Sequence, residues 1–356
     1  MIRNKNHQED GHHREGDGRG TSVEDRPHES VGVSASTERQ APRGSAPDGR
    51  VELEETRNRN SLPTWKAVSF WLVHRFLTLV LLVTGLRGLY LFSVGFGTLE
   101  WSINYKRRRK YRRALNRLLP GQHTRSEQRR ITLKHFQQAR CDKVFYLILD
   151  QLSREQAASL LTIDQKELLH DCIDRERGVY IAFSHHGSIH VIAALMSMAG
   201  YKTAGVRDKN EGPIRVYVQR RLDRRHGEFQ RTRFMFNDAF PREIYRCFEE
   251  GYMLASAMDA SRKRNPNQKS ESVQMFGEER ELLTGPLHVA FRCKSPMLQA
   301  FAIAEPNFRY RLHITGMLID PDKVTDRGVA ISEAIEVYAR TLEQLVREQP
   351  ALITRP

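Results

Sequence analysis

Apolar positions recur along the chain with two spacings, which predict strands and helices in alternation. Short runs rich in β-branched and aromatic residues, such as VYIAF at 179–183, are typical of buried strands. Six more such runs predict strands at 201–206, 233–237, 252–258, 272–276, 297–303 and 310–316. Helical spacing predicts helices at 125–153, 164–178, 190–200, 212–226, 239–250, 285–293 and 328–347. The alternation favours an α/β fold with a mixed, mainly parallel sheet flanked by helices.

A hydrophobic segment at residues 63–103 precedes this region. Between Phe76 and Phe96 its only charge is Arg87, and the run approaches the ~20 residues that cross a hydrocarbon core. The basic stretch 104–130 follows, and its Lys and Arg cluster at 106–113 suits an anionic membrane surface. We therefore expect a membrane segment, either one span or an interfacial helix, although a helix pair in the core of a soluble protein has the same composition. By the positive-inside rule, we expect the following domain to face the cytoplasm from the inner (cytoplasmic) membrane.

Composition adds two domain boundaries and limits the partners. Residues 1–62 contain almost no side chains to bury, which predicts a disordered polar tail, and residues 131–350 form the predicted α/β domain. The net charge of +14 calls for an acidic partner. Because the basic cluster adjoins the apolar segment and has few interleaved aromatic residues, we expect lipid phosphate and no nucleic acid. The four cysteines are too widely spaced for a zinc module, and no nucleotide-binding fingerprint is present, so no cofactor is expected.

The stretch FSHHGSIHVIAAL at 183–195 places three histidines where a predicted strand gives way to a helix. Functional groups gather at this edge of α/β sheets, so His185 is a candidate general base. We expect Ser184 to act as a helix N-cap and the helix to begin near Gly187. A polar turn without catalytic function is the alternative. His186 and His190 are four residues apart, but no third ligand is evident, so we expect no metal site.

From about residue 65 to 345, the chain resembles the lipid A biosynthesis lauroyl/myristoyl acyltransferases, a branch of the lysophospholipid acyltransferase-like superfamily. HHGSIH resembles the motif His-x-Gly-x-x-acidic, with His185 as its histidine and Gly187 as its glycine. Three later segments are also similar to family segments: AGVRDKNEGPIRVYVQRRLDRRHG, YMLASAMDASRKRN and MFGEERELLTGPLHVAFRCKSPMLQAFAI. One position departs from the pattern, because His190 stands where the family has an acidic residue.

The resemblance implies O-acyl transfer from an acyl thioester, on acyl-carrier protein or CoA, to a hydroxyl of a lipid or glycolipid acceptor. His185 would be the base and His190 its partner, which can hydrogen-bond but cannot offset positive charge. The missing charge would come from Asp208, Glu211 or Asp259. The residues expected to bind substrate are Gly187, Ser188, Arg207, Asp208, Asp259 and Arg262. The alternative is a membrane-bound lipid-binding or accessory protein with weakened catalysis because of His190.

Overall fold

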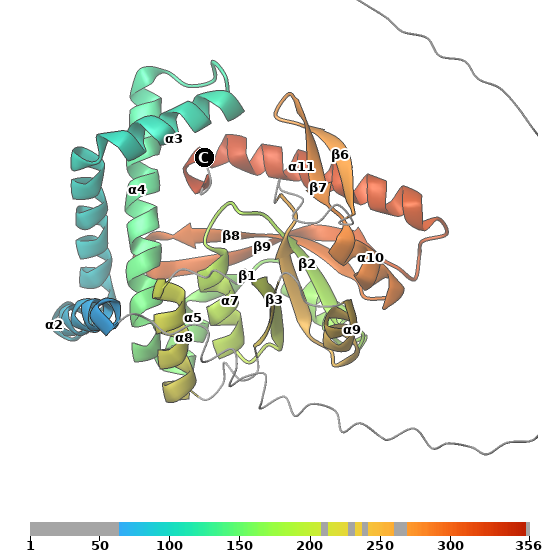
Figure 1. Cartoon of the computed structure of the whole chain (residues 1–356), viewed down its shortest axis with the longest axis horizontal. Coiled ribbons are helices and arrows are strands. Elements are labelled where there is room, and N and C mark those ends of the chain that lie inside the picture. The colour runs from blue at the N-terminus through green and yellow to red at the C-terminus, as the bar shows by residue number, and fades with distance from the viewer. Residues whose placement is uncertain (1–63, 208–212, 227–231, 237–240, 260–268, 354–356) are drawn as a thin grey trace, which may run out of the picture. The chain divides into compact units, whose positions relative to one another are not determined.

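The computed structural model describes residues 64–207, 213–226, 232–236, 241–259 and 269–353. The predicted polar tail, 1–62, lies outside the described residues. The structured part is an α/β fold with a seven-stranded sheet in the order β1-β9-β8-β2-β5-β3-β4 (Figure 1). All neighbouring strands are parallel except β8 and β9, which confirms a mixed, mainly parallel sheet. The strands of this sheet are β1 (Leu161–Ile163), β2 (Val179–Phe183), β3 (Thr203–Arg207), β4 (Arg233–Phe236), β5 (Met253–Ala257), β8 (Met297–Glu305) and β9 (Arg309–Ile319).

Within the described residues, each predicted strand and helix has a counterpart, but helix α5 (Arg154–Ser159) was not predicted. Two strands were also missed. These are β1, which is only three residues long, and β7 (Glu278–Leu283), which forms a separate antiparallel hairpin with β6 (Ser270–Met275). Phe276 and Gly277 turn this hairpin, both with positive φ, as expected of a two-residue turn. The described helices of the domain are α4 (Arg125–Ile148), α5 (Arg154–Ser159), α6 (Lys166–Ile173), α7 (Ile189–Met198), α8 (Pro213–His226), α9 (Pro241–Glu249), α10 (Gly285–Arg292) and α11 (Arg327–Glu348), with the short 3-10 helices η1 (Leu149–Gln151), η3 (Pro306–Phe308) and η4 (Pro350–Leu352).

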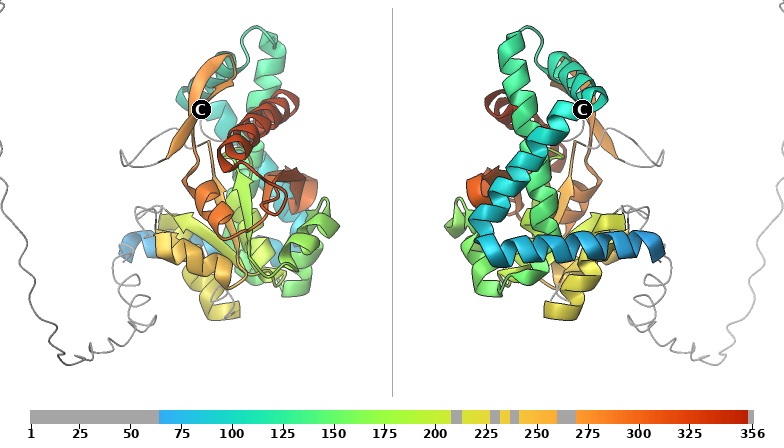
Figure 2. Two further views of the ribbon diagram at one scale, coloured as in Figure 1. Left: turned by 90° about the vertical axis from the view of Figure 1, so that its right-hand side faces the viewer. Right: turned by 90° about the vertical axis from the view of Figure 1, so that its left-hand side faces the viewer.

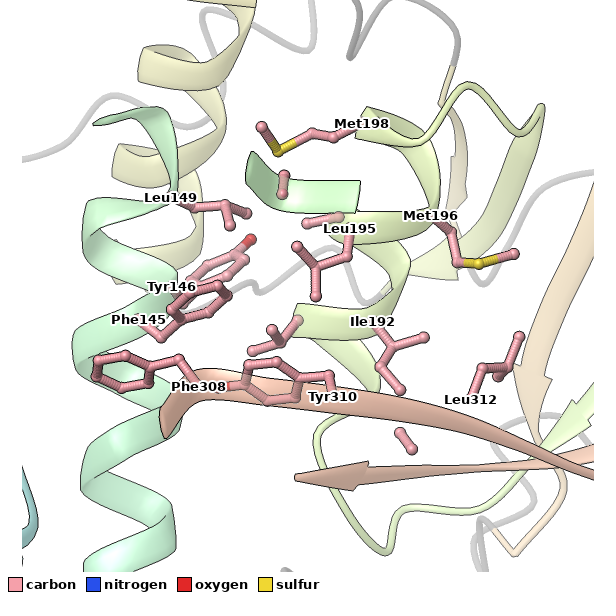
Figure 3. Close-up of a cluster of buried hydrophobic side chains, with 14 of the residues drawn as sticks. Phe145, Tyr146, Leu149, Ile192, Leu195, Met196, Met198, Phe308, Tyr310 and Leu312 are labelled. Atoms are coloured by element: carbon pink, nitrogen blue, oxygen red, sulfur yellow. The ribbon is translucent and has the colours of Figure 1, made fainter. Parts of the chain in front are cut away.

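Two hydrophobic cores lie on opposite faces of the sheet. Alternate residues of β2 supply both, so that Ile181 packs with α4, α7 and α8 while Tyr180 packs with α9, α10 and α11. A strand buried on both faces reads as an unbroken apolar run, which is why VYIAF was recognisable in the sequence. Figure 3 shows the first core, where Phe145 of α4 and Leu195 of α7 meet Tyr310 of β9.

The apolar segment forms one long helix, α2 (Thr64–Ile103), which is broken at Gly85 (φ 69°, ψ −175°). It is long and apolar enough to cross a membrane. Helix α3 (Tyr105–Leu118) carries the basic cluster, with Asn104 as its N-cap. Helix α4 begins at Arg125, where the sequence predicted a helix to start, and packs along α2 (Figures 1 and 2).

Candidate active site

The histidine-rich loop follows β2 at the carboxyl edge of the sheet. Helix α7 begins at Ile189 with Ser188 at the N-cap position, so the expectation that Ser184 would cap it was wrong. Ser184 is buried, and its Oγ accepts a hydrogen bond from the His186 amide at 3.2 Å. This bond tightens the turn between β2 and α7 before the helix starts. The loop therefore presents His185 and His186 at the end of a strand that is itself buried on both sides.

Asp259 approaches His185 from the neighbouring strand. Because β2 and β5 are parallel, with Phe183 opposite Ala257, the residues that follow them meet at one edge of the sheet. The His185 amide donates to both carboxylate oxygens of Asp259 at 2.9 Å, and His185 Nδ1 lies 2.7 Å from Oδ1. His186 Nδ1 is 3.4 Å from Oδ2. One carboxylate thus fixes the main chain and the ring of His185 together.

Asp259 is held as a carboxylate. Its side chain is 8% exposed. Burial alone would raise the pKa of Asp259, but the contacts from the His185 and His186 imidazoles hold that pKa well below its ordinary value. When Nδ1 of His185 donates to Asp259, Nε2 carries the lone pair of the neutral imidazole. This is the arrangement that a histidine base requires.

Only glycine fits at position 187, because of its backbone conformation and the close approach of β8. Its φ is +87°, and a Cβ there would lie 2.0 Å from the carbonyl oxygen of Ala302 in β8. The Gly187 amide donates to Leu352 at 3.0 Å, and the Ser188 amide donates to Ala302 at 2.9 Å. Each N–H has one hydrogen, so these two amides are used within the fold. We therefore do not propose these two amides as donors to substrate, although Gly187 and Ser188 were expected from the sequence to bind it.

Ser188 has a buried partner that the sequence analysis missed. Its Oγ donates to Oδ2 of Asp142 in α4 at 2.5 Å, and the Tyr310 hydroxyl donates to Oδ1 at 3.2 Å. Burial raises the pKa of Asp142 to about 6, and the two hydrogen bonds offset only part of that effect. An acid inside the apolar stretch CDKVFYLIL is the only sequence signal for this cluster.

His190 points into different surroundings. Its ring lies edge-on to Tyr146, with 5.1 Å between ring centroids. Burial, followed by the nearby charges of Arg215 and Lys143, lowers the pKa of His190 to about 4. The His190 ring is therefore neutral near pH 7, and the charges close to it are positive. The structure places the Asp259 carboxylate against Nδ1 of the His185 ring.

The remaining expected site residues are only partly described. Arg207 ends β3, which pairs with β5, so its main chain lies at the same edge of the sheet as His185 and Asp259. Asp208, Glu211 and Arg262 lie outside the described residues. Within the described part of the chain, no group of three His, Cys, Asp or Glu residues could hold a metal ion.

A family model for bacterial lipid A biosynthesis acyltransferases matches residues 56–352. The chain belongs to this family. Membership implies a lipid A-type acyltransferase and confirms the resemblance carried by HHGSIH and the later segments. No curated protein matches the chain. The site above is thus the candidate active site of a lipid A-type acyltransferase. His190 replaces the motif acid, and Asp259, which follows β5, provides a carboxylate beside His185.

Proposed function

We propose that this protein transfers a fatty acyl chain from an acyl thioester to a hydroxyl of a lipid or glycolipid acceptor, with His185 as general base and Asp259 as its positioning residue. The observation that carries this proposal is the contact of Asp259 with both the amide and Nδ1 of His185. The donor is acyl-carrier protein or acyl-CoA. The family match supports the reaction class.

The proposed step begins when His185 Nε2 takes the proton of the acceptor hydroxyl. The oxygen attacks the thioester carbonyl carbon, and collapse of the tetrahedral intermediate breaks the carbon–sulfur bond. The imidazolium returns its proton to the departing sulfur, which leaves as a thiol. Asp259 offsets the positive charge on His185 while the proton resides there. We assign Arg207 and Arg262 to the developing oxyanion or an acceptor phosphate, and Asp208 to acceptor contacts.

We further propose that the domain faces the cytoplasm from the inner membrane. The apolar helix α2 is followed directly by the basic helix α3, a pattern that suits the anionic headgroups of the cytoplasmic leaflet. All four cysteines are free thiols, as a reducing compartment favours.

An accessory protein without turnover is the second candidate function, because His190 replaces the motif acid. That replacement removes a negative charge, and the pKa of His190, lowered to about 4, leaves its ring neutral. Asp259 supplies the charge that His190 lacks, which favours the enzyme.

The test is mass spectrometry of lipid products formed by the full-length protein with membrane lipid extract and both types of donor. Wild type should make an acylated lipid, and His185→Ala should make none. His170→Ala is the matched control, because His170 lies on α6 beside Tyr201, which precedes β3 at the opposite edge of the sheet. A product made equally by His185→Ala would refute the base. No product from wild type, beside an active family enzyme, would favour the accessory function.

A further inference from the structure

Helix α2 consists of two arms that meet at Gly85. The left-handed φ of 69° and extended ψ of −175° at Gly85 interrupt the helix, so residues 64–84 and 86–103 run in different directions. Figure 2 shows both arms lying along one side of the domain. Each arm has an inner face toward the domain and an outer face away from it.

The inner face of the first arm is anchored by a buried hydrogen bond. His74 Nε2 lies 2.9 Å from Asp150 Oδ1, and both side chains are at most 3% exposed. Asp150 also pairs with Arg221 of α8 at 2.9 Å. One turn further along, Leu77 is buried. The first arm is thus joined to η1 through a buried polar contact and, through Asp150, to the partly exposed Arg221 of α8.

The inner face of the second arm is joined to α4. At Gly97 the two helices approach so closely that a Cβ would lie 2.5 Å from the Cα of Gln137. The side-chain Nε2 of Gln137 donates to Thr98 Oγ1 at 2.9 Å. Glu100 pairs with Arg107 of α3 and with Arg140 of α4. Both arms are therefore fixed to the domain by specific contacts along their length.

The outer face of α2 carries exposed apolar side chains on both arms. Leu82 and Val83 are more than 70% exposed, and only Arg75 and Arg87 add charge to this face. We define the outer face by its exposed large hydrophobic residues: Trp65, Val68, Trp71, Leu72, Val73, Phe76, Leu79, Leu82, Val83, Leu91, Phe92, Phe96, Leu99 and Ile103. An exposed apolar surface of this extent marks an interaction site.

The chemistry beside the outer face identifies its partner. Helix α3 follows α2 after Asn104 and buries Tyr111, Leu115 and Leu118 on one side. Its other side exposes Lys106, Arg109, Lys110, Arg112 and Arg113. Apolar side chains next to a cluster of cations match the acyl chains and anionic headgroups of one bilayer leaflet.

We propose that α2 lies in the plane of one anionic leaflet, with its outer face among the acyl chains, and does not cross the bilayer. A spanning arm would meet lipid on all sides, so the inner-face contacts of His74 and Glu100 would break or would draw Asp150, Arg221 and Arg140 to membrane depth. Charged side chains are costly there. The in-plane position keeps every inner-face contact and covers the outer face.

The first test determines on which side of the bilayer each end of α2 lies. Lys66→Cys and Ser102→Cys, which replace polar residues near the two ends of α2 that are not part of the outer face, are introduced separately into the full chain with Cys293→Ser, because the other three native cysteines are buried. The proteins are bound to sealed phosphatidylethanolamine and phosphatidylglycerol vesicles and treated outside with an impermeant maleimide. Both cysteines should react fully. Protection of either one until the vesicles are opened would overturn the proposal.

The second test measures vesicle affinity. Leu82→Glu and Leu91→Glu should each weaken binding about tenfold or more, since each removes a leucine from the acyl region and replaces it with a charge. Val329→Glu is the control, because Val329 is 55% exposed on α11. Unchanged binding by both outer-face variants would overturn the proposal. So would loss of self-association in solution without loss of vesicle binding, which would make the outer face a contact between copies of the chain.

Discussion

Asp142 provides a sharp test of the electrostatics around the histidine loop. Its carboxyl is enclosed between α4, the Ser188 hydroxyl at the start of α7 and the Tyr310 hydroxyl of β9. Burial raises its pKa from 3.8 to about 6. We expect the isosteric change Asp142→Asn to remove a charge that the folded protein accommodates only at a cost.

The sign and size of the effect follow from that pKa. A carboxyl whose pKa is raised by folding binds protons more tightly in the folded state. Well below pH 3.8 the Asp142 carboxyl is protonated in both the folded and the unfolded state, so it does not change the free energy of unfolding. Between pH 3.8 and about 6, the unfolded protein loses this proton while the folded protein keeps it, so the stability of the folded state falls. Above about pH 6 the loss of stability reaches its full value, and the difference between the two pKa values corresponds to about 3 kcal/mol. The Asn variant has no ionisable group at this position, so its stability does not fall in this way with pH. Its hydrogen bonds to Ser188 and Tyr310 are weaker, which costs about 1 kcal/mol.

The assay is denaturant unfolding of both proteins in one detergent at several pH values from 4 to 7.5. The free energy of unfolding of Asp142→Asn minus that of wild type should increase by about 2.5 kcal/mol over this range, because part of the cost is already present at pH 4. Ser188→Ala should show the opposite sign, because the carboxylate then loses a hydrogen-bond donor. A difference between Asp142→Asn and wild type that is constant with pH, or that falls as pH rises, would refute the reasoning.

Three further changes test the loop itself. Asp259→Asn should lower kcat by about 10³–10⁴-fold in the acyl-transfer assay with an unchanged circular dichroism spectrum, and a loss below tenfold would mean that another group orients His185. Gly187→Ala should lower the free energy of unfolding by roughly 2–4 kcal/mol, because its Cβ would lie 2.0 Å from the Ala302 oxygen. Denaturant unfolding measures this loss, and a variant as stable as wild type would contradict the close approach. His190→Glu should change kcat by less than about tenfold, since Asp259 already supplies the charge, and a gain of several orders of magnitude would show that it does not.

Much of the fold was predictable because its central strands are buried on both faces. Such strands are uninterrupted apolar runs, and Gly178 and Gly200 mark the neighbouring turns. Strand β7 was missed because only Leu282 of its sequence EERELL is buried, so the strand shows no apolar run. Strand β1 was missed because three residues carry no recognisable period.

The candidate site was predictable only in part. The apolar pattern changes from strand spacing to helix spacing near residue 184, and His185 indeed lies in the loop between β2 and α7. Its partner could not be chosen among Asp208, Glu211 and Asp259, because the choice depends on which strand lies beside β2. Strand order is set by packing of the whole domain, and Asp259 is 74 residues from His185 along the chain. Asp142 was missed for the same reason, since its contacts join three separate elements.

The surroundings of His190 make Asp259 indispensable to the proposed reaction. Arg215 and Lys143 oppose positive charge near His190, and the lowered pKa of that ring keeps it neutral. The imidazolium that forms on His185 must therefore be balanced elsewhere. Asp259 stays ionised, contacts the correct ring nitrogen and fixes the backbone of the same residue. The motif stretch alone would suggest an inactive member of the family, whereas the pairing of β2 with β5 supplies the missing carboxylate from another part of the chain.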